Sequence, residues 1–408
     1  MDGLKAVVLA GGEGERMRPI TYTRPKAMLQ VAGKPLIWHV LSNLKKARVK
    51  EAVVVVKYRK EQIIDYLSKE NLGMTIEFAV QGEKHGTAAA IEAAKGKAGE
   101  DFLVVDGNNV CDSEIYRDVV EKHEGGKTVG LKKVDNPHGF GIAEVKNGVL
   151  TGMEEKPEHP KGNLANISIY AFNKGIFDEI KKLAPSPRGE YEITDVLKGA
   201  HVVETEDFWM DVGYPWHLFT LNEYLLGKME ANTGLVENST VKGKLIMEEG
   251  AEVVDSFVEG ASYIGAGTKI GPHALLRGFN SIGRNCEIGE STTVKNSILF
   301  DGVKAKHLTY IGDSVVGEGV NFGSGTQVAN YRFDSSHVNV LTEKGWVNSA
   351  RKKLGAIIGD EAKFGVLSCT MPGKMIGNGC WIGSGVTVNT NLRPGQKIFL
   401  KSEHTVIG

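Results

Sequence analysis

The chain has 408 residues, enough for two or more domains with sizeable cores. Its 49 Lys and Arg residues nearly balance its 50 Asp and Glu residues, so the net charge of −1 provides no field that would hold nucleic acid or an anionic membrane. No apolar run is long enough for a membrane span and no signal peptide precedes the first predicted strand, so we expect a cytoplasmic protein whose partners are small molecules or other subunits.

A glycine-rich loop with several cations follows the first apolar run. The run from Ala6 to Ala10 predicts a buried strand. Glycine has no Cβ, so backbone N–H groups of such a loop can approach an anion, and nearby cations supply the charge that a triphosphate needs. The spacing is that of neither a P-loop nor a dinucleotide-binding loop, because Met17 stands where the third glycine of the latter would be. The cations are Arg16, Arg18, Arg24 and Lys26.

This loop resembles the signature of the sugar-1-phosphate nucleotidyltransferases, L-A-G-G-x-G-x-R-x-x-P followed by P-K. The alternative is a glycine-rich turn in an unrelated α/β protein with surface arginines. The resemblance implies that the phosphate of a sugar 1-phosphate attacks the α-phosphorus of a nucleoside triphosphate and that pyrophosphate leaves. It assigns nucleotide binding to Leu9, Gly11, Gly12 and Gly14, and the catalytic cations to Arg16 and Lys26.

Residues 1–228 alternate strand-like and helix-like stretches, with helices predicted at 36–47 and 87–94. This alternation predicts an α/β domain with a mostly parallel, doubly wound sheet, whose ligands sit beyond the carboxyl ends of the strands. The loops at 11–26, 81–87 and 106–109 would converge there. After the first strand, the predicted strands are Ala52–Val56, Thr75–Ala79, Phe102–Val105, Thr128–Lys132 and Ile167–Phe172.

Other motifs of this domain also match the family. Gln81, followed by Gly86 and Thr87 at the start of a helix, resembles the base-reading segment, since an amide can satisfy a pyrimidine edge. Thr87 could instead only cap the helix. The resemblance assigns sugar-phosphate binding to Gly141 of Gly139-Phe140-Gly141, Glu155 of E-K-P and Asn166 of N-I-S.

The predicted metal site departs from the family pattern. The motif W-M-D-V-G-Y-P resembles W-x-D-x-G-x-P, whose aspartate, here Asp211, would hold Mg²⁺. The family usually places Gly-Asp after the central strand, whereas this chain has Asp106-Gly107-Asn108, so Asn108 replaces a carboxylate. Mg²⁺ usually relies on one or two carboxylates plus substrate phosphates. Either Asp106 reaches the site, or transfer is slow, or the domain binds nucleotide without catalysis.

From about Val241, apolar residues recur every six positions, often followed by glycine. This period predicts a left-handed parallel β-helix at 241–408, joined by a linker at 229–240, in which each aliphatic side chain points into a triangular coil. The family resemblance implies a homotrimer or a multiple of one. The repeat positions are Ile264, Ile270, Leu276, Ile282, Ile288 and Val294, then Tyr310, Val316, Phe322 and Val328, then Ile358, Phe364, Thr370, Ile376, Ile382 and Val388.

The segments at 306–313, 320–326 and 329–331 resemble the carboxyl-terminal half of the bifunctional glucosamine-1-phosphate acetyltransferase and N-acetylglucosamine-1-phosphate uridylyltransferase, especially its archaeal form. A sugar amine must lose a proton before it attacks a thioester, which suits a histidine. A lone exposed histidine that breaks a coil register is the alternative. The resemblance assigns the base to His307, substrate positioning to Tyr310 and Asn330, and phosphate binding to Arg277 and Lys295.

Residues 330–354 interrupt the repeats and predict a projecting loop. Its run Arg351-Lys352-Lys353 would meet the phosphates of coenzyme A or form a solvated charged surface. Bacterial relatives have a lysine soon after the position of Asn330; in this chain Arg332 is the nearest cation.

The sequence therefore favours a bifunctional enzyme that uses acetyl-CoA, UTP and Mg²⁺ to make UDP-N-acetylglucosamine from glucosamine 1-phosphate. One alternative is a monofunctional glucose-1-phosphate thymidylyl- or uridylyltransferase whose β-helix is an oligomerisation stem. Another is a nucleotide-sensing first domain, because of Asn108. Galactosamine 1-phosphate, glucose 1-phosphate and dTTP stay open as substrates, since one substituent changes binding by only a few kcal/mol.

Overall fold

The computed structural model describes residues 4–401, and the chain forms two compact units. The first unit comprises Met1–Glu13, Arg24–Leu29 and Pro35–Val212. The second comprises Gly14–Thr23, Gln30–Lys34 and Gly213–Gly408, so two short segments from the amino-terminal part of the sequence belong to it.

The first unit is built on a nine-stranded sheet of order β5-β4-β1-β6-β11-β8-β12-β10-β9. The strands β5, β4, β1 and β6 run parallel, as predicted, whereas β11 is antiparallel to both β6 and β8, which makes the rest of the sheet mixed. The bounds are β1 Lys5–Leu9, β4 Glu51–Val56, β5 Thr75–Val80, β6 Asp101–Asp106, β8 Lys127–Lys133, β9 Gly141–Lys146, β10 Val149–Glu155, β11 Leu164–Asn173 and β12 His201–Glu204. Each predicted strand is therefore present.

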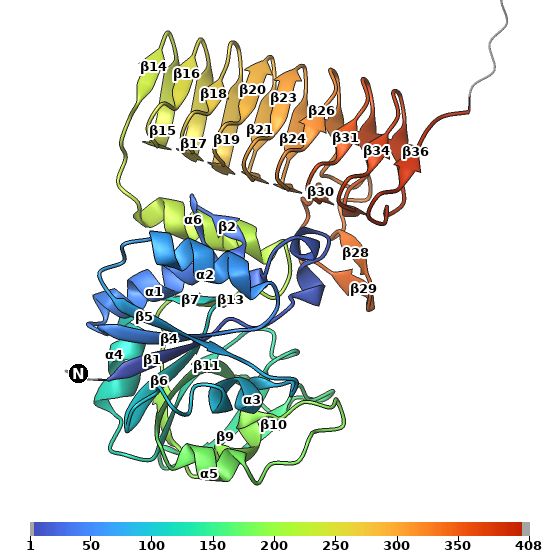
Figure 1. Cartoon of the computed structure of the whole chain (residues 1–408). Helices are drawn as coiled ribbons and strands as arrows, with labels where there is room; N and C mark the ends of the chain where they lie inside the picture. The colour runs from blue at the N-terminus through green and yellow to red at the C-terminus, as the bar shows by residue number, and fades with distance from the viewer. Residues whose placement is uncertain (1–3, 402–408) are drawn as a thin grey trace, which may run out of the picture. The chain divides into compact units, whose positions relative to one another are not determined.

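Helices cover both faces of this sheet (Figure 1), with α1 and α2 on one face and α3 and α5 on the other. Burial on both faces explains why β4 reads as the continuous apolar run A-V-V-V-V. On the α3 face, Val7 and Val53 share a core with Ile91 and Phe177. The helical bounds are α1 Leu36–Lys46, α2 Lys60–Lys69, α3 Thr87–Glu92, α4 Ser113–Glu121 and α5 Ile176–Ile180, with 3₁₀ turns η3 Lys26–Met28 and η4 Ile193–Val196.

A small second sheet continues the chain beyond the carboxyl end of β6. The strand β7 (Asn109–Cys111) pairs antiparallel with β13 (Trp209–Asp211), and the register sets Asp211 opposite Asn109. Two predicted polar motifs, distant in the sequence, therefore meet at the edge where ligands are expected.

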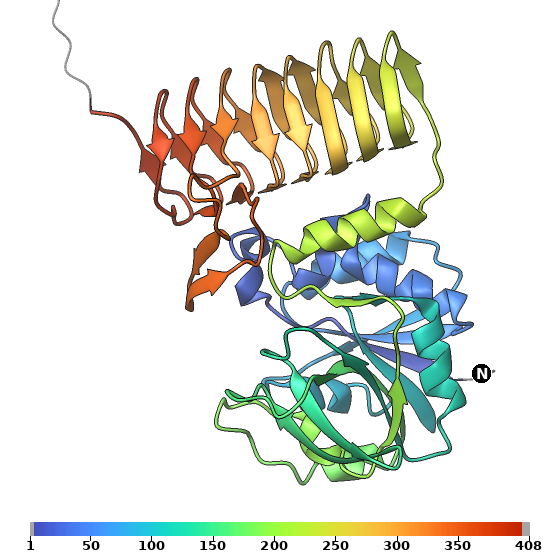
Figure 2. The ribbon, with the colours of Figure 1, turned by 180° about the vertical axis from the view of Figure 1, so that it is seen from behind.

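The second unit consists largely of stacked coils whose strands form two parallel sheets, seen from opposite sides in Figures 1 and 2. Val253 pairs with Ile270 and Ile270 with Ile288, so one turn of the chain takes 17 or 18 residues, three six-residue repeats. The first sheet comprises β14 Leu235–Glu237, β16 Glu252–Val254, β18 Lys269–Ile270, β20 Glu287–Glu290, β23 Lys304–His307, β26 Asn321–Phe322, β31 Lys363–Phe364, β34 Trp381–Ile382 and β36 Lys397–Ile398. The second comprises β15 Thr240–Met247, β17 Phe257–Ile264, β19 Leu275–Ile282, β21 Thr293–Lys295, β22 Ile298–Leu299, β24 Tyr310–Gly312, β25 Val315–Val316, β27 Gln327–Val328, β30 Ala356–Ile358, β32 Cys369–Thr370, β33 Lys374–Ile376 and β35 Thr387–Val388.

The six-residue repeat predicts the core of these coils with one error. Fourteen of the sixteen repeat positions are buried hydrophobic members of one core cluster, and Thr370 is fully buried in register with Val328 and Val388. Tyr310 is only partly buried, and Ile311 takes the core position instead, because Val316 follows Ile311 after five residues rather than six. The aromatic side chain of Tyr310 is thereby released from the core.

A helix, an insertion and several short elements complete the second unit. The helix α6 (His217–Lys228) shares a small core with the coils through Leu226 and Tyr263. The predicted loop at 330–354 is an insertion that carries the hairpin β28 (Asn339–Thr342) and β29 (Gly345–Asn348). The remaining short elements are η1 Glu15–Met17, η2 Ile20–Tyr22, β2 Gln30–Val31 and β3 Lys34–Pro35. Over residues 4–401, none of the helices combines the length and hydropathy needed to cross a bilayer.

Candidate active sites

The glycine loop after β1 leaves backbone donors available. Within residues 4–401, no group accepts a hydrogen bond from the N–H of Gly11 or Gly12. A Cβ on Gly11 would lie 2.8 Å from Oε1 of Gln81, so glycine lets the Gln81 side chain come against the loop. Two predicted nucleotide-binding segments are thus adjacent, with backbone N–H groups open to an anion.

Gly86 and Thr87 support a neighbouring segment. Gly86 has a φ of 106°, and a Cβ there would collide with the backbone of Tyr191. The hydroxyl of Thr87 accepts a hydrogen bond from the N–H of Ile193 at 3.0 Å, and α3 has no side-chain cap. The alternative in which Thr87 only caps the helix is therefore wrong. Gln81 donates to the carbonyl of Lys84 at 3.0 Å.

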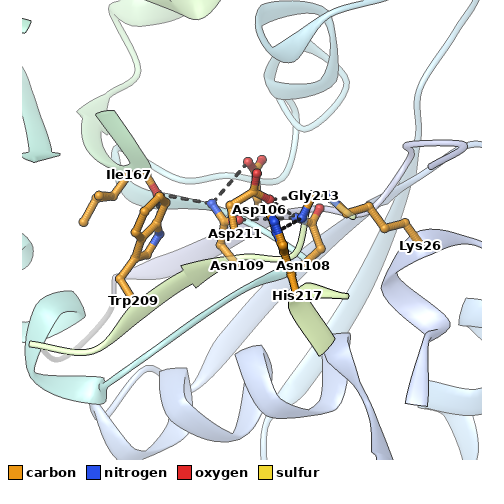
Figure 3. Close-up of polar contacts among 9 residues, drawn as sticks. All are labelled: Lys26, Asp106, Asn108, Asn109, Ile167, Trp209, Asp211, Gly213 and His217. Atoms are coloured by element: carbon orange, nitrogen blue, oxygen red, sulfur yellow. Dashed lines mark hydrogen bonds and ion pairs between the residues drawn. The ribbon is translucent and has the colours of Figure 1, made fainter. Parts of the chain in front are cut away.

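Asp211 is the centre of a polar cluster in the first unit (Figure 3). Nδ2 of Asn108 donates a hydrogen bond to Oδ1 of Asp211 at 2.9 Å, and Nζ of Lys26 lies 3.4 Å from the same oxygen. The carbonyl of Leu9 accepts a hydrogen bond from Gly107 at 2.8 Å, which fixes the turn that carries Asn108. The structure therefore brings Leu9, Lys26, Asn108 and Asp211 into one arrangement.

Asp106 supplies a second carboxylate to this cluster. Burial raises the pKa of Asp106 to about 6, and the negative charge of Asp211 adds to the rise, whereas Lys26 and a hydrogen bond with Ser168 oppose it. Two carboxylates that repel each other in this way match the ligand preference of a hard divalent cation. Residues 4–401 contain no cluster of three or more His, Cys, Asp or Glu side chains with metal-site geometry, so substrate phosphates would have to complete such a site.

Asn166 organises a bulge in β11. Its Nδ2 donates to the hydroxyl of Tyr170 at 2.7 Å, and its Oδ1 accepts from the N–H of Ser168 at 3.0 Å. Ser168 has a φ of 55°, and the pairing with β8 shifts register between Asn166 and Tyr170. Ser168 was not predicted, because no sequence signal marks a bulge that directs its hydroxyl towards Asp106.

Gly141 and Glu155 are direct partners across β9 and β10. A Cβ on Gly141 would lie 2.9 Å from Oε2 of Glu155, so glycine leaves room for that carboxylate. Glu155 lies 2.8 Å from Nζ of Lys156 and 3.7 Å from a guanidinium nitrogen of Arg188, a cation that the sequence analysis did not identify. The predicted sugar-binding residues therefore include one acid that is already ion-paired.

Gly14 and Arg16 belong to the second unit. Gly14 has a left-handed φ of 70°, and its carbonyl accepts hydrogen bonds from Met17 N–H at 2.8 Å and the Thr21 hydroxyl at 2.7 Å. The guanidinium of Arg16 lies 5.4 Å from the ring centroid of Tyr214. Arg16 is exposed and faces a cavity of about 360 Å³.

The coils of the second unit gather the predicted phosphate-binding cations. Arg277, Lys295 and Gly312 are in register on successive coils. Burial lowers the pKa of Lys295, the charges of Lys353 and Arg277 lower it further, and Asp313 opposes them. Lys353 is thus a third cation of this cluster, which the sequence analysis placed in a possible coenzyme A contact.

A hydrogen-bonded network of three side chains adjoins these cations. Nδ2 of Asn330 donates to Oδ2 of the buried Asp313 at 2.5 Å and to the hydroxyl of Tyr310 at 3.2 Å. A Cβ on Gly312 would lie 2.6 Å from both Nδ2 of Asn330 and the Tyr310 hydroxyl, so only glycine leaves room for the pair. Tyr310 and Asn330 therefore lie together, and Asp313 orients the Asn330 amide.

His307 ends β23 with an exposed imidazole. Its Nδ1 lies 3.5 Å from Oε2 of Glu290, which is its direct neighbour on the preceding coil. A carboxylate at Nδ1 would leave Nε2 as the nitrogen that accepts a proton. Glu290 is a further residue that was not predicted from the sequence, because its partner is a full coil away.

The structure of the insertion contradicts two expectations about its cations. Arg351 lies over the ring of Phe219 at 5.0 Å, and burial lowers its pKa, so it is not a solvated contact for coenzyme A. Arg332 pairs with Asp334 at 2.7 Å instead of joining the cationic cluster of Arg277 and Lys295. Lys353, which forms a backbone bridge with Tyr331, takes that place.

Comparisons with known proteins match two separate parts of the chain. The nucleotidyl transferase family matches residues 5–228, and the GMPPB C-terminal domain matches residues 257–392. The bifunctional protein GlmU of Methanocaldococcus jannaschii is 37% identical, with 98% of each chain covered. A bifunctional sugar-1-phosphate nucleotidylyltransferase/acetyltransferase of Sulfurisphaera tokodaii is 37% identical over 96% of this chain and 99% of its own.

Among solved structures, similarity is found to a protein of Bacillus anthracis assigned as a glucose-1-phosphate thymidylyltransferase, in complex with sucrose. It is 31% identical, covers 57% of this chain and 97% of its own, and has a TM-score of 0.50. The coverage corresponds to a little over half of this chain, whereas the bifunctional relatives match nearly all of it.

Proposed function

The chain belongs to the nucleotidyl transferase family and, over nearly its whole length, to the family of bifunctional GlmU proteins, and from this premise we propose that it makes UDP-N-acetylglucosamine in two steps. In the first step, an acetyl group passes from acetyl-CoA to glucosamine 1-phosphate. In the second, the product reacts with UTP and releases pyrophosphate. The observation that carries the proposal is that one chain holds both the Lys26–Asp211–Asp106 cluster and the His307–Glu290 and Tyr310–Asn330–Asp313 groups.

Acetyl transfer is assigned to the second unit. His307 takes one proton from the sugar ammonium, and the free amine attacks the thioester carbonyl. As the C–N bond forms and the C–S bond breaks, the nitrogen gives a second proton to the departing sulfur, and coenzyme A leaves as the thiol. Arg277, Lys295 and Lys353 bind the sugar phosphate, since all three lie in one cationic group. Tyr310 and Asn330 position the sugar beside them.

Nucleotidyl transfer is assigned to the first domain of the sequence, residues 1–228. A phosphate oxygen of N-acetylglucosamine 1-phosphate attacks the α-phosphorus of UTP, and the bond to pyrophosphate breaks, without a protein nucleophile. The free N–H groups of Gly11 and Gly12 and the charge of Lys26 bind the phosphates, so the residues act by positioning and charge neutralisation.

The carboxylates of Asp106 and Asp211 would hold Mg²⁺, and they fit it because they are two oxygen donors whose mutual repulsion a cation would relieve. When bound, Mg²⁺ supplies positive charge against the phosphates of UTP. Asn108 then acts as a hydrogen-bond donor to Asp211 rather than as a ligand. With this assignment, Asp106 and Asp211 give the domain two carboxylates for the cation, although position 108 is an asparagine and not the aspartate usual in the family.

We further infer that the stacked coils form a left-handed β-helix at residues 241–408, and that the assembly is a homotrimer or a multiple of one. The parallel sheets and the turn length of 17 or 18 residues support the β-helix. Flat faces of parallel coils favour association of subunits, which supports an oligomer.

The test is product analysis with the full-length protein. Glucosamine 1-phosphate, acetyl-CoA, UTP and Mg²⁺ are incubated together, and mass spectrometry follows the products. We expect UDP-N-acetylglucosamine, and N-acetylglucosamine 1-phosphate when UTP is omitted. Formation of UDP-N-acetylglucosamine only when N-acetylglucosamine 1-phosphate is supplied would instead identify a monofunctional nucleotidyltransferase with the coils as a stem.

A further inference from the structure

One strand of the first unit contains a residue in a conformation that regular strands do not use. Ser168 has a φ of 55°, although it lies inside β11. Across residues 4–401, every other non-glycine residue with a left-handed φ lies outside the helices and strands. A side chain with a Cβ is strained in this region, and such a conformation persists only where the surroundings fix it. Ser168 is therefore a position whose surroundings are informative.

A chain of hydrogen bonds with one direction runs from Asn166 to Asp106. The N–H of Ser168 can only donate, and it donates to Oδ1 of Asn166 at 3.0 Å. Nδ2 of Asn166 therefore faces the hydroxyl of Tyr170, to which it donates at 2.7 Å. The hydroxyl of Ser168 is hydrogen-bonded to both Tyr170 and Asp106. Because an ionised carboxylate only accepts hydrogen bonds, Ser168 donates to Asp106 and accepts from Tyr170.

The bulge is fixed to both strands of the small sheet that carries the polar cluster (Figure 3). The carbonyl of Ile167 accepts a hydrogen bond from Nδ2 of Asn109 at 3.2 Å and another from Nε1 of Trp209 at 3.1 Å. Asn109 belongs to β7, and Trp209 belongs to β13, the strand that also carries a predicted metal ligand. Nδ2 of Asn109 also lies 3.5 Å from Oδ2 of Asp106. Ser168, which follows Ile167, is thereby held in a fixed position beside Asp106.

Each carboxylate of the cluster has its own hydrogen-bond donors. Asp211 accepts a hydrogen bond from Asn108, whereas Asp106 is contacted by Ser168 and Asn109. Ser168 and Asn109 are neutral, so they orient the carboxylate without cancelling its charge. A carboxylate that is already oriented loses less conformational freedom when a cation binds to it.

We propose that Ser168 is a positioning residue for nucleotidyl transfer, which holds the Asp106 carboxylate in the orientation that binds a divalent cation together with Asp211. The proposal rests on the proposed function, because it concerns the Mg²⁺ site of that reaction. It gives the strained bulge a purpose, since a bulge directs a side chain where a regular strand would not. Glycine adopts this φ without strain but has no hydroxyl, so substitution by glycine separates the stability of the bulge from its contact with Asp106.

Binding of UTP to the full-length protein, measured by isothermal titration calorimetry, tests this role. The Kd for UTP is measured once with Mg²⁺ and once with a chelator, so that the comparison isolates the contribution of the cation. The proteins are wild type, Ser168→Ala, Ser168→Gly, Asp106→Asn and the double variant of Asp106→Asn with Ser168→Ala. Ser113→Ala is the matched control, because the hydroxyl of Ser113 also donates to a carboxylate, that of Glu114 at 3.0 Å. Melting temperature and pyrophosphate release are measured on the same preparations.

We expect Ser168→Ala and Ser168→Gly to weaken UTP binding in Mg²⁺ about tenfold and to leave it unchanged in chelator. The reason is that the hydrogen-bond partners of metal ligands typically contribute at least this much to metal affinity. The melting temperature of Ser168→Gly should not fall, because glycine relieves the left-handed strain. The double variant should bind no more weakly than Asp106→Asn, because Ser168 acts through Asp106. Ser113→Ala should bind as wild type does.

Unchanged UTP binding in Mg²⁺ for either Ser168 variant would overturn the proposal, because both variants lack the hydroxyl. An equal loss in Ser113→Ala, or a further loss in the double variant, would overturn it as well. Absence of pyrophosphate release from UTP and N-acetylglucosamine 1-phosphate in the wild type would instead overturn the proposed function.

Discussion

Asn108 donates a hydrogen bond to Asp211 at 2.9 Å, and Asp106, two residues earlier, contributes the carboxylate whose pKa the charge of Asp211 helps to raise. The sequence order Asp-Gly-Asn, in place of the usual Gly-Asp, therefore keeps two negative charges in the cluster. The turn is held by the hydrogen bond from Gly107 to the carbonyl of Leu9. This relationship decides how substitution at position 108 should behave.

We predict that Asn108→Asp does not activate nucleotidyl transfer. The variant loses the donor to Asp211 and adds a third carboxylate, whose repulsion must be overcome when the site is free of cations. Pyrophosphate release should stay at or below the wild-type rate, and the melting temperature in chelator should fall by a few degrees. A gain of about tenfold or more would show that Asp106 does not serve as the second carboxylate.

Gly312→Ala should damage acetyl transfer selectively. The new Cβ would lie 2.6 Å from the Tyr310 hydroxyl and from Nδ2 of Asn330, so both side chains must move. Misplacement of positioning groups by about 1 Å can cost about a hundredfold in rate. We expect a loss of that order in thiol release, with normal pyrophosphate release. Gly227→Ala in α6, where a Cβ meets no neighbouring atom, is the control and should retain both activities.

Lys353 and Arg332 provide a matched pair of cations in the insertion. Lys353 lies in the cluster with Lys295, whereas Arg332 pairs with Asp334. Lys353→Ala should raise the KM for glucosamine 1-phosphate about tenfold or more, because a phosphate contact is lost, and Arg332→Ala should not. Equal effects of the two substitutions would contradict the assignment of Lys353 to the phosphate site.

Lys295 should show a conflict between stability and binding. Its pKa is lowered by burial and by Lys353, so the charged form is disfavoured in the folded protein. This charged form lowers the free energy of unfolding by its full amount at pH values below the pKa of Lys295 in the folded protein. The loss disappears as the pH rises to 10.5, the ordinary pKa of lysine. Without substrate, Lys295→Met should therefore melt higher than wild type at pH 7, with the difference shrinking towards pH 10.5, while its KM for glucosamine 1-phosphate rises. A lower melting temperature of the variant at pH 7 would contradict this account.

Regular patterns allowed most of the fold to be predicted. The apolar run of β4 and the repeat from Ile264 to Val294 report burial directly, because each position has one environment along a strand or coil. The repeat failed at Tyr310, where one corner is a residue shorter and Ile311 takes the core position. A single shortened repeat of this kind cannot be recognised from a regular spacing of six residues.

The site could be predicted only where a motif is local. Asp211 and His307 stand within recognisable strings. The contacts of Ser168 with Asp106, of Glu290 with His307 and of Lys353 with Lys295 come instead from a bulge, a neighbouring coil and the end of an insertion. Arg351 shows the reverse error, since a basic run suggests exposure but its guanidinium lies over Phe219. Such contacts depend on tertiary packing.

The most direct test of the account is to measure thiol release and pyrophosphate release for one preparation each of wild type, His307→Ala and Asp211→Asn. If the two sites are independent, His307→Ala should reduce the rate of thiol release about a hundredfold or more and leave pyrophosphate release unchanged. Asp211→Asn should reduce pyrophosphate release to a similar extent and leave thiol release unchanged. Retention of thiol release in His307→Ala, or loss of both activities in either variant, would contradict the assignment of two separate active sites to this chain.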